Sequence, residues 1–175
     1  RVGSEMCIRG SQKAEKERMN GGHPCQAVPV LKDVMGEVKK QYPDASRENT
    51  GFGSTIFAVK PGDGSAREQA ASCQKVLGGW ANIANEYATK RYRSNLINWG
   101  MLPFLIQPGD LPFKNLDYLF VPGIKKAVED KAEEIKAYVV TPGEGMKEFS
   151  LKLGELTDEE RQIILKGCLI NYNRV

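Results

Sequence analysis

The middle of the chain alternates apolar runs with helical patterns, and this alternation limits the possible folds more than any other feature of the sequence. The apolar runs cover residues 55–59, 80–84 and 101–106, and helical patterns occupy residues 65–76 and 86–99 between them. Strands that alternate with helices usually pair in parallel through right-handed crossovers. Ligands of such sheets bind at the carboxyl ends of the strands. The sequence therefore predicts an α/β domain with a ligand site at one edge of its sheet.

A glycine turn follows the first of these predicted strands. Gly62 and Gly64 allow a positive φ or a close approach of a ligand to the backbone. Ser65 is predicted to begin a helix, where free amides and the helix dipole favour an anion. Arg67 can bind a carboxylate through two hydrogen bonds. However, Ser65 and Glu68 also fit a capping box, which needs no ligand, and on the local pattern alone this structural interpretation stands slightly ahead.

Composition limits the function without naming it. The 175 residues are 41% hydrophobic and 27% charged, as in one soluble globular domain. The net charge of +3 suits a small anionic substrate and is too small to indicate nucleic acid. Neither a membrane-spanning run nor a signal-peptide pattern occurs. The four cysteines are too widely spaced for a zinc or iron–sulfur motif, so we expect free, half-buried thiols and a cytoplasmic location. The one histidine, His23, lies in a predicted loop and receives no role.

The remaining segments complete the expected fold. Residues 12–18 are predicted to form a loop or short helix, residues 31–42 a helix, residues 117–121 a strand, residues 124–136 a short helix or covering loop, and residues 137–140 and 149–153 a hairpin. Thr157, followed by three acidic residues, is predicted to cap a final helix, with a polar tail after it.

Two motifs carry a resemblance to the aconitase superfamily. Residues 64–71, GSAREQAA, resemble the family's GSSREHAA, and residues 91–103, RYRSNLINWGMLP, resemble RIHRSNLxxxGxLP. The order and spacing of the two motifs match the family. Residues 1–11 are similar to a weaker family stretch, RGNxxxxxRGT, and the predicted hairpin and final helix are similar to the end of aconitase. Residues 12–50 match least.

The resemblance implies a fold and a domain arrangement. Residues 1–175 would be one swivel domain, a three-layer β/β/α unit that forms the C-terminal part of a longer hydratase. In the family this domain closes over a [4Fe–4S] cluster held by a separate domain, and the cluster iron acts as a Lewis acid. The implied partners are therefore the N-terminal cluster-binding domains and a di- or tricarboxylic hydroxy acid. Because this chain supplies no cluster thiolates, we expect it to be inactive alone.

The resemblance also implies roles for individual residues. Ser65 would be the base of a reversible dehydration, Arg67 would bind a substrate carboxylate, and Gly64 and Ala66 would line the substrate beside them. A serine alkoxide is unstable in water, but helix amides and arginines in a closed, dry site can stabilise it. An ungapped match places a second active-site arginine at Arg1, with the nearby Arg9 as the alternative.

Three departures from the family motifs put the substrate in question. Ala66 stands where the family has a second serine, and Gln69 and Tyr92 replace two histidines. These changes indicate a divergent hydratase. Three other interpretations stay open: the stand-alone small subunit of an isopropylmalate-type dehydratase, an RNA-binding regulatory relative, and a folded domain that has lost its activity, consistent with Ala66.

Overall fold

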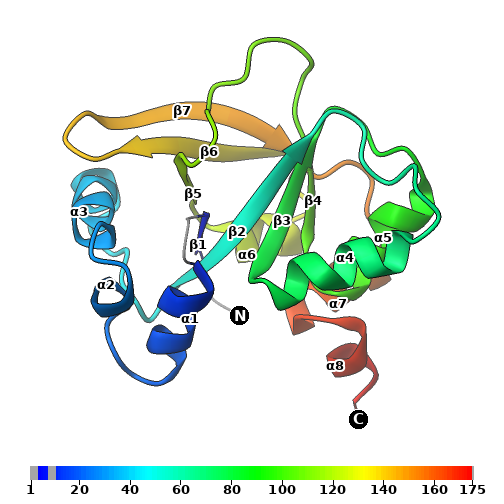
Figure 1. Ribbon diagram of the computed structural model, residues 1–175, viewed down its shortest axis with the longest axis horizontal. Coiled ribbons are helices and arrows are strands. Elements are labelled where there is room, and N and C mark those ends of the chain that lie inside the picture. Colours follow the sequence, from blue (N-terminus) through cyan, green and yellow to red (C-terminus); the bar gives the residue numbers. More distant parts are fainter. Residues whose placement is uncertain (1–3, 8–10, 175) are drawn as a thin grey trace.

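The structure is a computed structural model that describes residues 4–7 and 11–174 (Figure 1). Its described strands form a closed barrel in the order β1-β2-β3-β4-β7-β6-β5. Their bounds are Ser4–Cys7 (β1), Thr50–Ala58 (β2), Gly79–Ala84 (β3), Leu102–Leu105 (β4), Tyr118–Val121 (β5), Glu134–Thr141 (β6) and Gly145–Lys152 (β7). β1 to β4 are parallel, and β5 to β7 are antiparallel. The predicted α/β class and the parallel pairing in the middle of the chain are confirmed.

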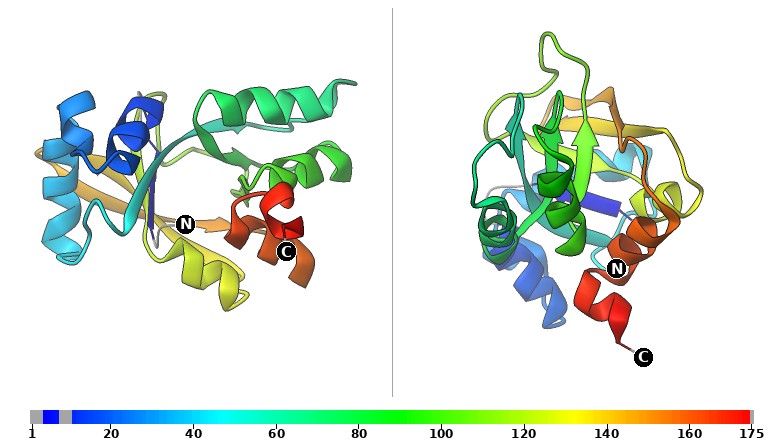
Figure 2. Two further views of the ribbon diagram at one scale, coloured as in Figure 1. Left: turned by 90° about the horizontal axis from the view of Figure 1, so that it is seen from below. Right: turned by 90° about the vertical axis from the view of Figure 1, so that its right-hand side faces the viewer.

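Helices cover the barrel in two groups. Their bounds are Ser11–Met19 (α1), Pro24–Ala27 (α2), Leu31–Gln41 (α3), Arg67–Val76 (α4), Lys90–Asn98 (α5), Ile124–Glu129 (α6), Asp158–Lys166 (α7) and Leu169–Asn173 (α8). Figure 1 and the left view of Figure 2 place α1, α2 and α3 at one end of the molecule, and α4 and α5 at the other. Within the described ranges, no helix is long and apolar enough to cross a membrane.

The main core lies between the two halves of the barrel. Ile83 of β3 and Phe104 of β4 pair in register and pack with Leu119, Ile135 and Leu151 from the antiparallel strands. All five side chains are almost fully buried. Truncating such a phenylalanine to alanine costs about 3–5 kcal/mol, so this core fixes the strands that carry the candidate site.

A second core holds α3 against the opposite end of the barrel. Leu31, Val34 and Val38 recur at helical spacing, and they pack with Phe52 of β2 and Tyr138 of β6. This periodicity is the feature that predicted a helix over residues 31–42, and α3 confirms it. The helical face is therefore set by the sequence spacing.

Several boundaries differ from the sequence prediction. α5 begins at Lys90, not at residue 86, because the preceding segment folds back on the end of β2. There the amides of Asn85 and Ala88 donate to the carbonyls of Val59 and Pro61, at 3.2 and 2.9 Å. These bonds occupy the backbone that a longer helix would need. The chain also ends in α8 where a polar tail was predicted.

The end of the chain follows the sequence closely. β6 and β7 form the predicted hairpin and are longer than expected, pairing from Glu134 with Lys152 to Thr141 with Gly145. Thr157 caps α7 in a complete capping box with Glu160. These local patterns therefore predicted both elements correctly.

Candidate functional site

The predicted glycine turn lies where the sequence placed it, between the carboxyl end of β2 and the start of α4. Figure 1 shows this connection at the end of the molecule where α4 and α5 lie together. Gly64, Ser65 and Ala66 are exposed, and Arg67 is partly buried. The four residues assigned to the site within the described chain are therefore adjacent and open to solvent.

The predicted cap on α4 is wrong. α4 begins at Arg67, and its N-cap position is Ala66, with φ of −87° and ψ of 49° and no side-chain hydrogen bond. Ser65 lies one residue before that position, so its hydroxyl does not satisfy a helix amide. Glu68, the expected partner in the box, instead accepts a hydrogen bond from Trp99 Nε1 at 3.3 Å. Ser65 therefore has no capping role, and among the described residues its hydroxyl has no hydrogen-bond partner.

Gly62 is held in place by its backbone conformation and by its contacts with Tyr92, Arg67 and Thr89. Its φ is +97°, and a Cβ there would lie 2.5 Å from both Cβ and Cγ of Tyr92. Its carbonyl accepts two hydrogen bonds, from Arg67 Nε and Thr89 Oγ1, each at 3.2 Å. Only glycine satisfies both the backbone conformation and this close approach. Gly62 thus joins the turn to the start of both α4 and α5.

The bond to Gly62 sets how Arg67 can act. Its guanidinium is held through Nε, and no described residue pairs with the two terminal Nη nitrogens. Two parallel N–H groups of this kind match the two oxygens of a carboxylate. The other cation of the turn, Lys60, is bound to Glu86 at 2.6 Å, and this hydrogen bond raises the pKa of Lys60. Of these two cations, Arg67 is therefore the one that can bind an anion.

Tyr92 connects the turn to the sheet through buried hydrogen bonds. Only 2% of its surface is exposed, and its hydroxyl accepts hydrogen bonds from Asn82 Nδ2 at 2.8 Å and Gln74 Nε2 at 3.0 Å. Asn82 belongs to β3, Gln74 to α4 and Tyr92 to α5. The Tyr92 amide in turn donates to Thr89 Oγ1 at 3.2 Å. The position of a family histidine is thus filled by a tyrosine that links all three elements.

Sequence reasoning missed two residues of this support. Asn82 was counted as part of an apolar strand and Thr89 as part of a helix, yet one anchors Tyr92 and the other caps α5 and binds Gly62. The available signal for Asn82 was a polar residue inside an apolar run, because a buried amide requires partners.

The remaining sequence predictions concern two arginines, the cysteines and a metal site. Arg1 and Arg9 lie outside the described residues. Cys25 and Cys168 are free and partly buried, as expected, but Cys73 is exposed, contrary to the prediction. No group of three metal-binding side chains exists among the described residues. The described residues therefore do not fit an iron–sulfur cluster.

The arrangement can present a hydroxyl and a guanidinium to a molecule that arrives from outside the domain. Ser65 and the Nη nitrogens of Arg67 lie within three residues on one connection, and the nearby amides of α4 are free of a side-chain cap. This combination can bind a carboxylate and can place an oxygen close to it.

Comparisons with known proteins show what this chain is similar to. Residues 26–109 match the aconitase C-terminal domain, a range that includes the turn and both motifs. Aconitate hydratase A of Rickettsia bellii (strain RML369-C) is 24% identical to this chain over 177 aligned positions. That alignment covers 98% of this chain and 18% of the relative, so the chain spans less than a fifth of the protein it matches. Together, the two findings support an aconitase C-terminal domain.

Proposed function

We propose that this chain is the swivel domain of an aconitase-type hydro-lyase. It would take part in the reversible dehydration of a di- or tricarboxylic hydroxy acid. The observation that carries the proposal is the pairing, on one exposed turn, of an uncapped Ser65 with an Arg67 held only through Nε. The name of the relative, aconitate hydratase A, supports this class of substrate. The alignment to a short part of a much longer hydratase supports a domain of a larger protein over a stand-alone subunit.

The two side chains have separate roles in this proposal. Arg67 binds a substrate carboxylate through its Nη nitrogens and so fixes the carbon next to it. Ser65 accepts the proton from that carbon. Because an alkoxide forms only where water is excluded, the exposed turn has to be covered by another domain when substrate is bound. The [4Fe–4S] cluster would be held by that other domain, together with the remaining substrate contacts.

Gly64 and Ala66 complete the proposed substrate contact. A Cβ at Gly64 would meet nothing within 4 Å, so the space beside Ser65 is open. Ala66 has no hydroxyl where the family has one, which removes a hydrogen-bond donor to substrate. We therefore propose a substrate that places fewer polar groups at this position than the family's usual one.

The experiment is Ser65→Ala in the full-length protein, assayed by hydration of aconitate. Losing a general base lowers kcat by about 10²–10⁴-fold. Because Ser65 makes no cap and is exposed, the substitution should leave the urea unfolding curve unchanged. An unchanged kcat would refute the assignment of the base. A turnover number retained by residues 1–175 alone would refute the two-domain site.

A further inference from the structure

A hollow with a cationic rim lies at the end of the molecule opposite the Gly62–Arg67 turn. Residues of α2 and α3, which Figure 1 shows at that end of the molecule, contribute to its lining, and its volume is about 190 Å³. This volume is below the roughly 300 Å³ of the smallest drug-sized pockets. We propose that this hollow binds a small organic anion, with a phosphate or carboxylate head group on a compact apolar body. The proposal does not depend on the hydratase function.

Three cations surround the hollow. Lys32 and Lys39 are seven residues apart on α3, so they lie on one face of the helix and two turns apart. Arg47 reaches the hollow from the segment between α3 and β2. None of the described residues that line the hollow is acidic.

The acids closest in sequence are either paired or line another hollow. Glu37 binds Lys40 at 2.8 Å, and Glu48 binds Arg47 Nε at 2.7 Å. Asp33 and Glu37 line the adjacent hollow between α3 and the turn from β6 to β7, which shares Lys32 and Gly36 with this one. Glu48 offsets the charge of Arg47, whereas no described acid forms an ion pair with Lys32 or Lys39, so these two lysines give the rim a positive field that favours an anion.

Gly36 lies between the two lysines, in the middle of α3. Glycine destabilises a helix interior relative to alanine, and packing does not require it here, since a Cβ would meet nothing within 4 Å. Gly36 is also part of the lining. Its missing side chain leaves room for a ligand to reach the helix between Lys32 and Lys39.

Two donors are held in place before any ligand arrives. Arg47 Nη1 donates to the carbonyls of Gly21 and Gly22, each at 3.1 Å. His23 Nδ1 accepts from the Cys25 amide at 3.3 Å, so in the neutral ring the proton lies on Nε2, which can donate to a ligand. These bonds lower the cost of ordering the donors on binding.

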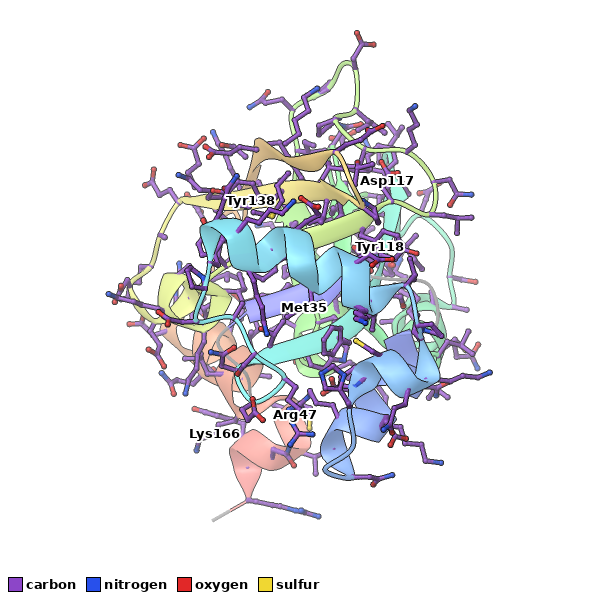
Figure 3. All side chains as sticks on the ribbon, turned by 90° about the vertical axis from the view of Figure 1, so that its left-hand side faces the viewer. Met35, Arg47, Asp117, Tyr118, Tyr138 and Lys166 are labelled. Atoms are coloured by element: carbon purple, nitrogen blue, oxygen red, sulfur yellow. The ribbon has the colours of Figure 1, made fainter. Side chains whose placement is uncertain are left out.

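The floor of the hollow is apolar. Pro24, Met35 and Phe52 contribute to the lining, and all three are buried. Figure 3 looks onto this face and labels Met35 and Arg47, which mark the floor and the rim. A head group can therefore meet the cations while an apolar body rests on the floor, and an inorganic anion would use only the first contact.

The test is calorimetric titration of the full-length protein with phenyl phosphate, benzoate, inorganic phosphate and benzyl alcohol. At least one of the two organic anions should bind at a single site, at least tenfold more tightly than inorganic phosphate. Benzyl alcohol should not bind. The stronger of the two organic anions identifies the head group. Absence of binding by both would overturn the proposal, as would binding of benzyl alcohol as tight as theirs.

Variants separate a built site from general attraction to a basic surface. Gly36→Leu should weaken binding at least tenfold without lowering the unfolding temperature, because leucine favours helix and the space is open. Lys39→Gln should weaken binding about threefold to tenfold. Lys125→Gln, which makes the same charge change on α6, should leave binding unchanged. Binding that survives Gly36→Leu, or that falls equally in both lysine variants, would overturn the proposal.

Discussion

Gly62→Ala should be among the most destabilising single substitutions of an exposed turn in this protein. The left-handed backbone, with φ of +97°, costs an alanine about 1–2 kcal/mol. The new Cβ would also meet Cβ and Cγ of Tyr92 at 2.5 Å, and overpacking of this kind costs about 1–3 kcal/mol. The neighbour cannot move freely, because the Tyr92 hydroxyl is bound to both Asn82 and Gln74. The expected loss is the sum, about 2–5 kcal/mol of unfolding free energy, out of the 5–15 kcal/mol typical of a domain.

Urea unfolding followed by circular dichroism measures this loss directly. Gly64→Ala is the matched control on the same turn, since its φ lies outside the positive region and a Cβ there meets nothing within 4 Å. Its effect should stay within about 1 kcal/mol and can be stabilising, because alanine restricts the unfolded chain. Repeating Gly62→Ala in a Tyr92→Gly background removes both contacted atoms, Cβ and Cγ, so the cost there should fall to the backbone part of about 1–2 kcal/mol.

Two results would refute this reasoning. If Gly62→Ala costs no more than Gly64→Ala, the turn is not anchored at Gly62. If the cost of Gly62→Ala is the same with and without Tyr92, the contact between them is not the cause.

Three other substitutions test the site and the surface. Tyr92→Phe removes the acceptor of the buried Asn82 amide and should cost about 1–3 kcal/mol in urea unfolding, whereas a cost below experimental error would mean that water replaces the hydroxyl. If Arg67 binds substrate as proposed, Arg67→Lys in the full-length protein loses two-point binding and should raise KM for aconitate about tenfold or more, and an unchanged KM would refute the proposed contact. The hydrogen bond with Lys131 lowers the pKa of Asp158, so this pair adds stability above the usual carboxyl pKa and loses it as the pH falls through the lowered value. In Lys131→Gln, an NMR titration should therefore show the Asp158 pKa moving back up, and a pKa that stays low would assign the effect to the start of α7.

The parallel part of the barrel could be predicted from the sequence because its determinants are local. Three apolar runs separated by two helical patterns define β2, β3 and β4 and their pairing. Barrel closure could not be predicted in this way. It depends on β1 pairing with β5 and on β4 pairing with β7 through Leu105 and Lys152, and these contacts join distant segments that no local pattern connects.

The candidate site divides in the same manner. Gly62 and Arg67 were singled out from the glycine-turn pattern, and Gly62 lies in the turn while Arg67 is the first residue of α4. Thr89 and Asn82 were missed because their roles arise only when the connection before α5 folds back onto the end of β2. Because these hydrogen bonds join residues of separate elements, the sequence of any one element gives at most a weak signal of them.

The two capping patterns of the chain show how tertiary hydrogen bonds can prevent a capping box that the sequence predicts. Ser65 with Glu68, and Thr157 with Glu160, have the same spacing, yet only the second pair forms a capping box, with bonds of 2.9 and 3.1 Å. At α7, Glu160 also pairs with Arg93 at 3.8 Å, but through Oε1, so its Oε2 still accepts from the Thr157 amide. At α4, Gly62 binds Arg67 and Trp99 binds Glu68, so the backbone at Ala66 leaves the conformation that a cap requires.

The missing cap has an energetic consequence. A serine cap contributes about 1 kcal/mol to a helix, and α4 forms without it. The same bonds that prevent the cap hold the guanidinium of Arg67 and leave the Ser65 hydroxyl exposed. Replacing Ser65 therefore should not weaken the helix, and this is what makes Ser65→Ala a clean test of chemistry. By contrast, Thr157→Ala should cost about 1 kcal/mol, since that hydroxyl is engaged in its box. If both substitutions destabilise the protein equally, Ser65 caps α4 in solution and its availability as a base would have to be abandoned.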